Sequence, residues 1–209
     1  MPDVMPFKCN ICNWEGTHYL KRDNSLVCPR CNSRQRHRSI YRYLEEHRLL
    51  VGNACLDVAS RRIFQRKLRY SNYVNIDIIP GRAEILMDVC DLKFSENKFD
   101  LIICCSVLQF VLAYETALDE LHRVLKPTGK CIIQVPYDCS SDHTIKQVSD
   151  AGLNKYRYRP EHEIVFFSYK DFLHCLQQRF LVETFFYQEP YISFSNQEFF
   201  VCSKIGLAM

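Results

Sequence analysis

Four cysteines near the start of the chain have the spacing of a metal site. Cys9 and Cys12 form one C-x2-C pair, and Cys28 and Cys31 form a second pair farther along the chain. Two such pairs complete the tetrahedral shell of one zinc ion, with metal–sulfur distances of about 2.3 Å. A shell of four protein ligands leaves no position for a substrate, so the spacing predicts one structural zinc. The alternative is four core cysteines, but so short a segment needs a staple to fold.

Basic side chains crowd the segment that follows the last of these cysteines. The spacing of apolar residues predicts a helix over residues 33–50, with Ser33 as its N-cap. Its first turn holds Arg34, Arg36, His37 and Arg38. Cations at this end oppose the helix dipole, which requires a cause outside the helix. Contact with RNA or another anion would supply one, and a plain surface cluster or a contact with the neighbouring domain is an equal alternative.

Charge and composition bound the classes of protein that this chain can belong to. Residues 1–48 carry nine Lys and Arg against five Asp and Glu, whereas residues 49–209 carry eighteen against nineteen. The positive excess therefore belongs to the front of the chain and hints at an anionic partner. The N-terminus does not resemble a signal peptide, and no run approaches the ~18 apolar residues that span a bilayer. We expect a cytoplasmic protein with reduced cysteines and no contact with a membrane.

Three acidic residues each end a strand that the sequence predicts. They are Asp57, Asp77 and Asp88. In open parallel sheets, ligands bind outside the carboxyl ends of the strands, where these acids would lie along one crevice. A single Asp at such a place is more often a turn or capping residue than a ligand contact. Three in succession predict a ligand-binding edge.

Strands and helices alternate from residue 53 onward. Apolar runs predict strands at 54–59, 72–79, 83–89, 98–110 and 130–137, and helical spacing predicts helices at 61–69 and 113–126. This order favours an α/β fold with a doubly wound, mainly parallel, Rossmann-like sheet. The closing elements are a polar, irregular segment at 138–163, a helix at 168–180 and strands at 181–188 and 198–205. An irregular segment of that length is usually a lid or a mobile insertion. We expect a small zinc-ribbon-like module at 1–32, a linking helix at 33–50 and an α/β domain at 51–209.

The sequence of the large domain carries a family resemblance. LDVA at 56–59, NIDI at 75–78, the run MDVCDLKFSENKFDLIICCSVLQFV from residue 87 and LDELHRVLKPTGKCIIQVP from residue 118 follow one another. Together they resemble class I S-adenosylmethionine-dependent methyltransferases of the methyltransferase-11 type. The most specific part is 88–136, and the whole resemblance covers about 53–205. The opening module, with CPRCxSxxRHR, looks like that of a bacterial subgroup of these enzymes.

The resemblance implies a binding position for each portion of S-adenosylmethionine. It places Asp57 near the methionine portion, Ala59 in the turn that follows, and Cys104, with Cys105, beside the sulfonium. For the nucleoside it implies that Asp77 accepts hydrogen bonds from the ribose hydroxyls and Ile78 lies against the adenine. Asp88 would face the adenine amino group, and the backbone of Val89 would face the ring edge.

Two departures from the family pattern keep a second hypothesis open. Ala59, Ser60 and Arg61 replace the glycine-rich turn that lets the backbone approach the cofactor, and Phe110 replaces a common histidine. The first hypothesis is an S-adenosylmethionine-dependent methyltransferase with an RNA, saccharide or small-metabolite acceptor. The alternative is a non-catalytic nucleic-acid-binding or protein-binding module with a degenerate methyltransferase fold. A single weak candidate for a general base is His162.

Overall fold

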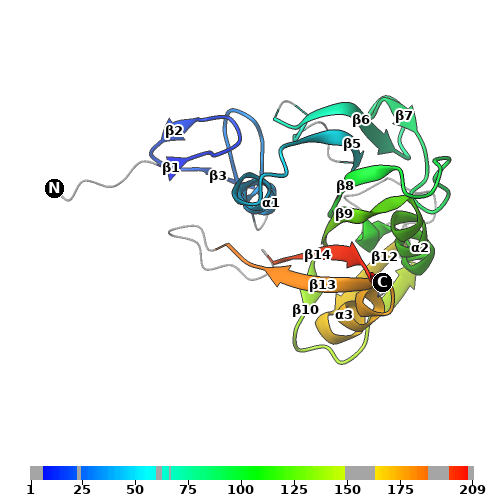
Figure 1. Ribbon diagram of the computed structural model, residues 1–209. Coiled ribbons are helices and arrows are strands. Elements are labelled where there is room, and N and C mark those ends of the chain that lie inside the picture. The colour runs from blue at the N-terminus through cyan, green and yellow to red at the C-terminus, as the bar shows by residue number, and fades with distance from the viewer. Residues whose placement is uncertain are drawn as a thin grey trace.

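A seven-stranded sheet forms the centre of the protein (Figure 1). The computed structural model describes residues 7–22, 25–59, 63–65, 67–148, 163–187 and 198–206. The strands are β5 (Val51–Val58), β6 (Arg69–Asp77), β7 (Ile85–Leu86), β8 (Phe99–Cys105), β9 (Leu125–Gln134), β13 (Phe180–Phe185) and β14 (Phe199–Lys204). Their order across the sheet is β13-β14-β9-β8-β5-β6-β7. β5 to β9 run parallel, whereas β14 runs antiparallel to β9 and β13 antiparallel to β14. The predicted doubly wound, mainly parallel α/β sheet is confirmed.

The direction of strand order reverses between β5 and β8. From β5 the chain moves outward to β6 and β7, then returns to place β8 on the other side of β5 and moves on to β9. Ligands of doubly wound sheets bind at this switch point, outside the carboxyl ends of the strands. β8 is buried along nearly its whole length, as its continuous apolar run predicts for a strand covered on both faces. The predicted strand at 83–89 is much shorter, because only Ile85 and Leu86 pair with β6.

The connection between β5 and β6 is too short for the helix predicted at 61–69. Arg69 lies beside Val51, so residues 59–68 must return the chain along all of β5, a path of about 23 Å at 3.3 Å per residue. The same ten residues would span only about 15 Å as an α-helix. Residues 63–65 and 67 accordingly form turns, and the described part of that prediction is wrong.

The N-terminal part of the chain covers one face of the sheet. It comprises β1 (Phe7–Lys8), β2 (Glu15–Gly16), β3 (Leu20–Arg22), β4 (Ser25–Val27) and α1 (Gln35–Glu46). Ile40 and Leu44 of α1 belong to one buried cluster with Cys55, Ile103 and Phe199 of the sheet. This cluster also includes Cys9, Cys28 and Phe64. The short two-stranded ribbons and the sheet therefore share one hydrophobic core, and α1 lies between them (Figure 1).

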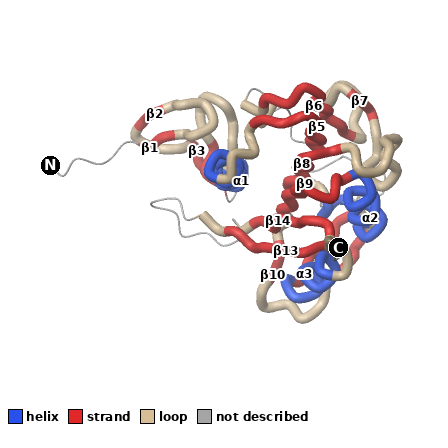
Figure 2. Tube along the Cα trace, viewed as in Figure 1, coloured by secondary structure: helices blue, strands red, loops and turns tan. Residues whose placement is uncertain are grey.

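Two further helices cover the opposite face (Figure 2). They are α2 (Tyr114–Val124), which follows the 3-10 turn η1 (Leu108–Phe110), and α3 (Tyr169–Gln177). Leu118 and Leu121 of α2 and Phe172 of α3 pack with Leu56 and Ile102 of the sheet. No helix in the described part of the chain is long and apolar enough to cross a bilayer.

The segment expected to be an irregular lid contains strands. β10 (Tyr137–Asp138) pairs parallel with β12 (Glu163–Ser168), and β11 (Ile145–Val148) pairs antiparallel with it. These strands form a small sheet beside α3. The irregular segment predicted for 138–163 is therefore wrong at both ends, and residues 149–162 lie outside the described structure.

The ExxR pair of α2 holds the loop that follows β7. Arg123 donates to both carboxylate oxygens of Glu120, at 2.7 and 2.8 Å, and to the carbonyls of Leu92 and Phe94, each at 2.7 Å. Glu120 in turn accepts the backbone N–H of Leu92 at 2.8 Å. The loop carries Asp88 and Val89. The pair thus fixes the loop that carries two of the predicted cofactor-binding residues.

Loss of this clamp should destabilise the whole domain. We expect Arg123→Leu to lower the free energy of unfolding by about 2–4 kcal/mol, because it leaves two carbonyls and one carboxylate with poorer partners. Urea denaturation measures the change. Arg123 lowers the pKa of Glu120, so the clamp contributes above the ordinary glutamate pKa and is lost in acid. The deficit of the variant should therefore shrink below about pH 4.

Arg42→Leu is the matched control for this experiment. Arg42 and Glu46 form an exposed pair on α1 at 2.8 Å, and such pairs contribute less than about 1 kcal/mol. Equal losses from the two substitutions would contradict a structural role for the Arg123 clamp.

Candidate functional site

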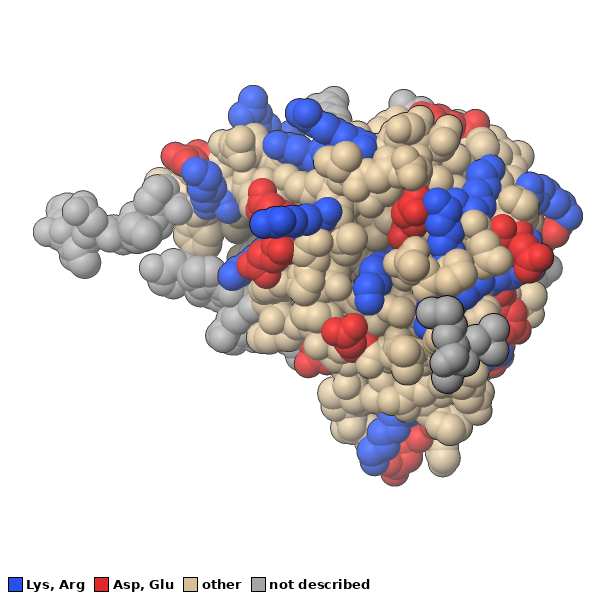
Figure 3. Space-filling model, in the orientation of Figure 1, with Lys and Arg blue, Asp and Glu red and all other residues tan. Residues whose placement is uncertain are grey.

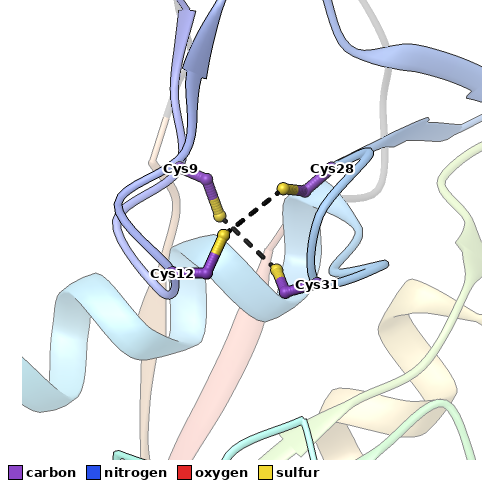
Figure 4. A group of neighbouring side chains, drawn as sticks. All are labelled: Cys9, Cys12, Cys28 and Cys31. Atoms are coloured by element: carbon purple, nitrogen blue, oxygen red, sulfur yellow. Dashed lines mark hydrogen bonds between the residues drawn. The ribbon is translucent and has the colours of Figure 1, made fainter.

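The four N-terminal cysteines converge on one point (Figure 4). Their sulfur atoms all lie within 4.8 Å of one another. Cys9 Sγ is 3.7 Å from Cys31 Sγ, and Cys12 Sγ is 3.5 Å from Cys28 Sγ. These distances are too long for disulfides, whose sulfurs are about 2.05 Å apart. They match the edges of about 3.8 Å of a tetrahedron of sulfurs 2.3 Å from a central zinc.

Ser33 belongs to this cluster and does not cap α1. Its Oγ lies 3.1 Å from Cys31 Sγ and 3.5 Å from Cys9 Sγ, and the residue is fully buried. The helix begins one residue later, with Arg34 as its N-cap. His37 serves this end of the helix by accepting the Arg34 backbone N–H on Nδ1 at 3.1 Å. Burial and the flanking arginines lower the pKa of His37, so its neutral ring can accept that bond.

The predicted cluster of basic residues is divided by the structure. Arg38 is 2% exposed and donates to the carbonyls of Ser33 at 2.9 Å and Leu26 at 3.2 Å. Its guanidinium also lies 4.0 Å from the centre of the Tyr19 ring. Arg38 is thus an interior residue of the module, and the expectation that it contacts an external anion is wrong.

The face of the molecule drawn in Figure 3 gives little support to a broad nucleic-acid-binding surface on that side. On the face drawn in Figure 3, the described Lys and Arg side chains are interleaved with Asp and Glu. Arg34 and Arg36 are half-buried. RNA binding at Arg34 and Arg36 stays a prediction.

Asp57 lies at the centre of the switch point. It is fully buried in β5, and its carboxylate accepts a hydrogen bond from the Tyr73 hydroxyl of β6. Asn75, also in β6, donates from Nδ2 to the Asp57 carbonyl at 2.8 Å. Asn75 lies directly opposite Asp57 in the strand register. Two residues of the neighbouring strand therefore fix both the side chain and the backbone of Asp57.

Two non-glycine residues take a left-handed conformation where the central strands end. Ala59 follows β5 with φ of 54°, and Ser106 follows β8 with φ of 57°. The Ala59 N–H bonds to the Ile76 carbonyl at 2.8 Å, and the Ser106 N–H bonds to the Gln134 carbonyl at 2.7 Å. Ala59 thus adopts at its own cost the conformation that the family's glycine supplies freely.

The nucleoside-binding residues of the family pattern lie along the outer part of the same edge. Asp77 ends β6 and is buried, and its Oδ1 accepts the Ile79 N–H at 2.9 Å. Ile78 beside it is 40% exposed, an apolar surface next to a polar one. Asp88 follows β7 and accepts the Cys90 N–H at 2.9 Å, while Val89 is buried. Both acids therefore keep their loops in tight turns.

The end of β8 turns its two cysteines to opposite faces of the sheet. Cys104 packs in the core against the α2 side, and burial raises its pKa. Its side chain therefore lies away from Asp57. Cys105 belongs to the cluster on the α1 face and lies 3.6 Å from Gln134 Oε1, which also accepts the Ser106 hydroxyl at 2.7 Å. At this strand end, Cys105 and Ser106 lie on the side of Asp57.

One remaining sequence-based candidate lies beyond the described structure. His162 lies outside the described residues, so its proposed role as a base stays a prediction. Phe110 ends η1, where the family often has histidine.

Sequence reasoning missed two polar partners of the site. Tyr73 lies two residues before Asn75 on the same face of β6, and a parallel β5–β6 register could have indicated it. Gln134 ends β9, the strand beside β8, and carried no such signal.

A glycine substitution usually destabilises a protein, but at Ala59, which has a left-handed conformation, we expect it to stabilise. We expect Ala59→Gly to raise the free energy of unfolding by about 1 kcal/mol, because glycine adopts positive φ without the steric cost. Thermal or urea denaturation measures the change. Ala117→Gly in α2 is the control and should lose about 1 kcal/mol or more. A loss of stability at position 59 would contradict this account of the turn.

Comparison with known proteins agrees with this architecture. Residues 49–133 match the family model described as a methyltransferase domain. The chain is 33% identical over 132 residues to the ubiquinone/menaquinone biosynthesis C-methyltransferase UbiE of Blochmanniella pennsylvanica, covering 54% of this chain and 50% of that protein. It spans half or less of the length of the curated relatives it matches.

Solved structures support the fold over a longer part of the chain. The PH0226 protein of Pyrococcus horikoshii superimposes with a TM-score of 0.56 at 16% identity, covering 84% of this chain and 94% of that one. The YcgJ protein of Bacillus subtilis gives a TM-score of 0.54 at 15% identity, covering 72% and 71%. Residues 49–133 therefore match a methyltransferase domain, and the sheet that they help to build has the class I methyltransferase fold.

Proposed function

We propose that this chain is an S-adenosylmethionine-dependent methyltransferase that binds its cofactor across the carboxyl ends of β5, β6 and β8. The observation that carries the proposal is the line of acids along that edge. Asp57 lies opposite Asn75 in β6, and Asp77 lies opposite Leu86 in β7. Because these strands are parallel, Asp57, Asp77 and Asp88 follow one another along one edge of the sheet.

The chemistry of these residues fits the parts of the cofactor in order. The carboxylate of Asp57, fully buried near the end of β5, has the charge that suits the ammonium of the methionine portion. Asp77 keeps one carboxylate oxygen on the Ile79 N–H and would use the other for the ribose hydroxyls. The exposed side chain of Ile78 would lie against the adenine ring, with Val89 and Asp88 at its edge.

The catalytic task of the protein in this proposal is mainly one of placement. The bound cofactor supplies an activated methyl group on a sulfonium. The residues of the crevice would bind and orient it, and hold an acceptor in line while excluding water. The α1 face and the β8 end would form the inner wall of that site.

The positions of the basic residues bear on which methyl acceptor the protein uses. Arg38 is committed to the interior of the module, and the charges on the visible face are mixed. Both observations favour a small-molecule acceptor over RNA. The name of the UbiE relative, which places that protein in quinone biosynthesis, supports the same class.

The four-cysteine cluster would hold one structural zinc ion. All four sulfurs point inward, and the Ser33 hydroxyl lies within hydrogen-bonding distance of two of them, where it could donate to one zinc-bound thiolate. The ion would hold together the two C-x2-C turns, Cys9–Cys12 and Cys28–Cys31, that precede α1. Its function in this proposal is to complete the core on that face of the sheet, with no part in the methyl transfer.

Calorimetry with S-adenosylhomocysteine tests the enzyme proposal. The wild-type chain should bind with one site, and Asp77→Asn should weaken binding about 10-fold or more, because hydrogen bonds to a charged acceptor contribute about 1.5–3 kcal/mol. Asp91→Asn, an exposed acid of the neighbouring loop, is the matched control and should bind like wild type. A folded wild-type protein that gives no binding heat would overturn the proposal.

Metal analysis tests the zinc site. Gently purified protein should contain about one zinc per chain, and removal by a chelator should unfold the N-terminal module and lower the melting temperature. Cys12→Ser should lower zinc content and stability together, whereas Cys139→Ser, an exposed cysteine outside the cluster, should change neither. A stable, metal-free protein with all four cysteines reduced would contradict the assignment.

A further inference from the structure

A cationic side chain from the N-terminal module reaches the switch point of the sheet. Arg36 is the second residue of α1, and α1 shares one buried cluster with Cys105, the last residue of β8. Burial raises the pKa of the Cys105 thiol, and the nearby Arg36 guanidinium lowers it. The Asp57 carboxylate of the adjacent strand β5 also acts on Cys105 electrostatically. A guanidinium and a carboxylate therefore lie around the ends of the two central strands.

The fold itself makes little use of this arginine. Its Nε is buried and has no hydrogen-bond partner among the described residues. Cys105 supplies no counter-charge, because burial raises the pKa of its thiol and keeps it neutral near pH 7. Arg38 on the same turn shows the contrast, with two backbone carbonyls as partners and a tyrosine ring beneath it. A buried N–H without an acceptor is costly, so the site around Arg36 is suited to an anion.

The turn that carries Arg36 is held in place from both sides. His37 bonds to the Arg34 N–H, and its ring packs edge-on against Phe64 of the β5–β6 connection, with centroids 5.9 Å apart. On the other side, Ser33 joins the turn to the cysteine cluster. Arg36 is therefore presented by a rigid segment, which lowers the entropy cost of using it for binding.

We propose that Arg36 binds the carboxylate of the methionine portion of S-adenosylmethionine, on the opposite side of that amino acid from Asp57. The inference rests on the proposed function and names a residue for a part of the cofactor that the family pattern left unassigned in this chain. An amino acid is a zwitterion, so its site needs one cation and one anion a few ångströms apart. The planar fork of arginine matches a carboxylate through two parallel hydrogen bonds.

A comparison of two cofactor forms isolates this contact. Decarboxylated S-adenosylmethionine keeps the nucleoside, the sulfonium and the ammonium and lacks only the carboxylate. Wild-type protein should bind S-adenosylmethionine about 10- to 100-fold more tightly than the decarboxylated form, as expected for a charge-assisted pair. Arg36→Gln should lose that factor for S-adenosylmethionine and bind the decarboxylated form like wild type. Isothermal titration calorimetry on the full chain measures all four affinities.

Arg34→Gln is the matched control, because it removes the same charge from the same turn. It should keep the wild-type preference for the carboxylate. Arg36→Lys keeps the charge without the fork and should retain only part of the preference, with an unchanged melting temperature as the check on folding.

Two results would overturn the inference about Arg36. Equal loss for both cofactor forms in Arg36→Gln, or the same loss in Arg34→Gln, would overturn it. If neither Arg36 variant folds, the wild-type measurement still decides, since equal affinity for the two forms would overturn the inference. No binding of either form to folded wild-type protein would instead overturn the proposed function, and the inference with it.

Discussion

The short return from β5 to β6 is the constraint on which the rest of the structure depends. The described part of this connection, residues 63–65 and 67–68, forms no helix, so within the described structure no crossover helix covers the face of the sheet beside β5 and β8. The apolar side chains of that face need a cover, and α1 with the N-terminal module provides it. Cys55 and Ile103 of the sheet share a core with Ile40 and Leu44 for this reason.

This arrangement explains why a cysteine cluster stands at the front of a methyltransferase fold. A module of this size has too little apolar surface to order itself, and four thiolates around one ion would supply the missing free energy. Once ordered, it contributes Tyr19, Cys9 and Cys28 to the core that it shares with the sheet. The module thus forms one layer of the domain, packed on the sheet, rather than a separate unit beside it.

Sequence alone predicted the parts of the fold that depend on composition and spacing. The continuous apolar run predicted β8 because both faces of that strand are buried. The amphipathic pattern predicted α2 because one face of that helix is buried. The four cysteines were readable because their spacing is local. The helix predicted at 61–69 failed because its periodicity says nothing about the distance that the connection must cover. Ser33 failed as an N-cap because the sulfur cluster, a tertiary contact, holds its hydroxyl.

The candidate site was also predictable only in part from the sequence. Strand ends indicated Asp57 and Asp77, whereas Tyr73 became visible only with the strand register. The arginines at the helix start lie at the wrong end for the helix dipole, and one of the three possible causes, a contact with the neighbouring domain, involves tertiary structure. Arg38 donates hydrogen bonds inside the module, whereas Arg36 lowers the pKa of Cys105 in the sheet against the larger effect of burial, which raises it. Their identical side chains and neighbouring positions gave no means to tell these roles apart.

Ser33 and Arg36 lie at the start of α1, between the cysteine cluster and the central sheet. Ser33 contacts the sulfurs of Cys9 and Cys31, and the helix that carries Arg36 begins at the next residues. His37 then fixes the same turn against Phe64 in the connection that follows Asp57 and Ala59. A disturbance of the sulfur shell therefore reaches the carboxyl end of β5 and β8 through a single turn of helix. The end of β5, whose turn lacks glycine, depends on this support, because a left-handed Ala59 persists only where the contacts around it outweigh its steric cost.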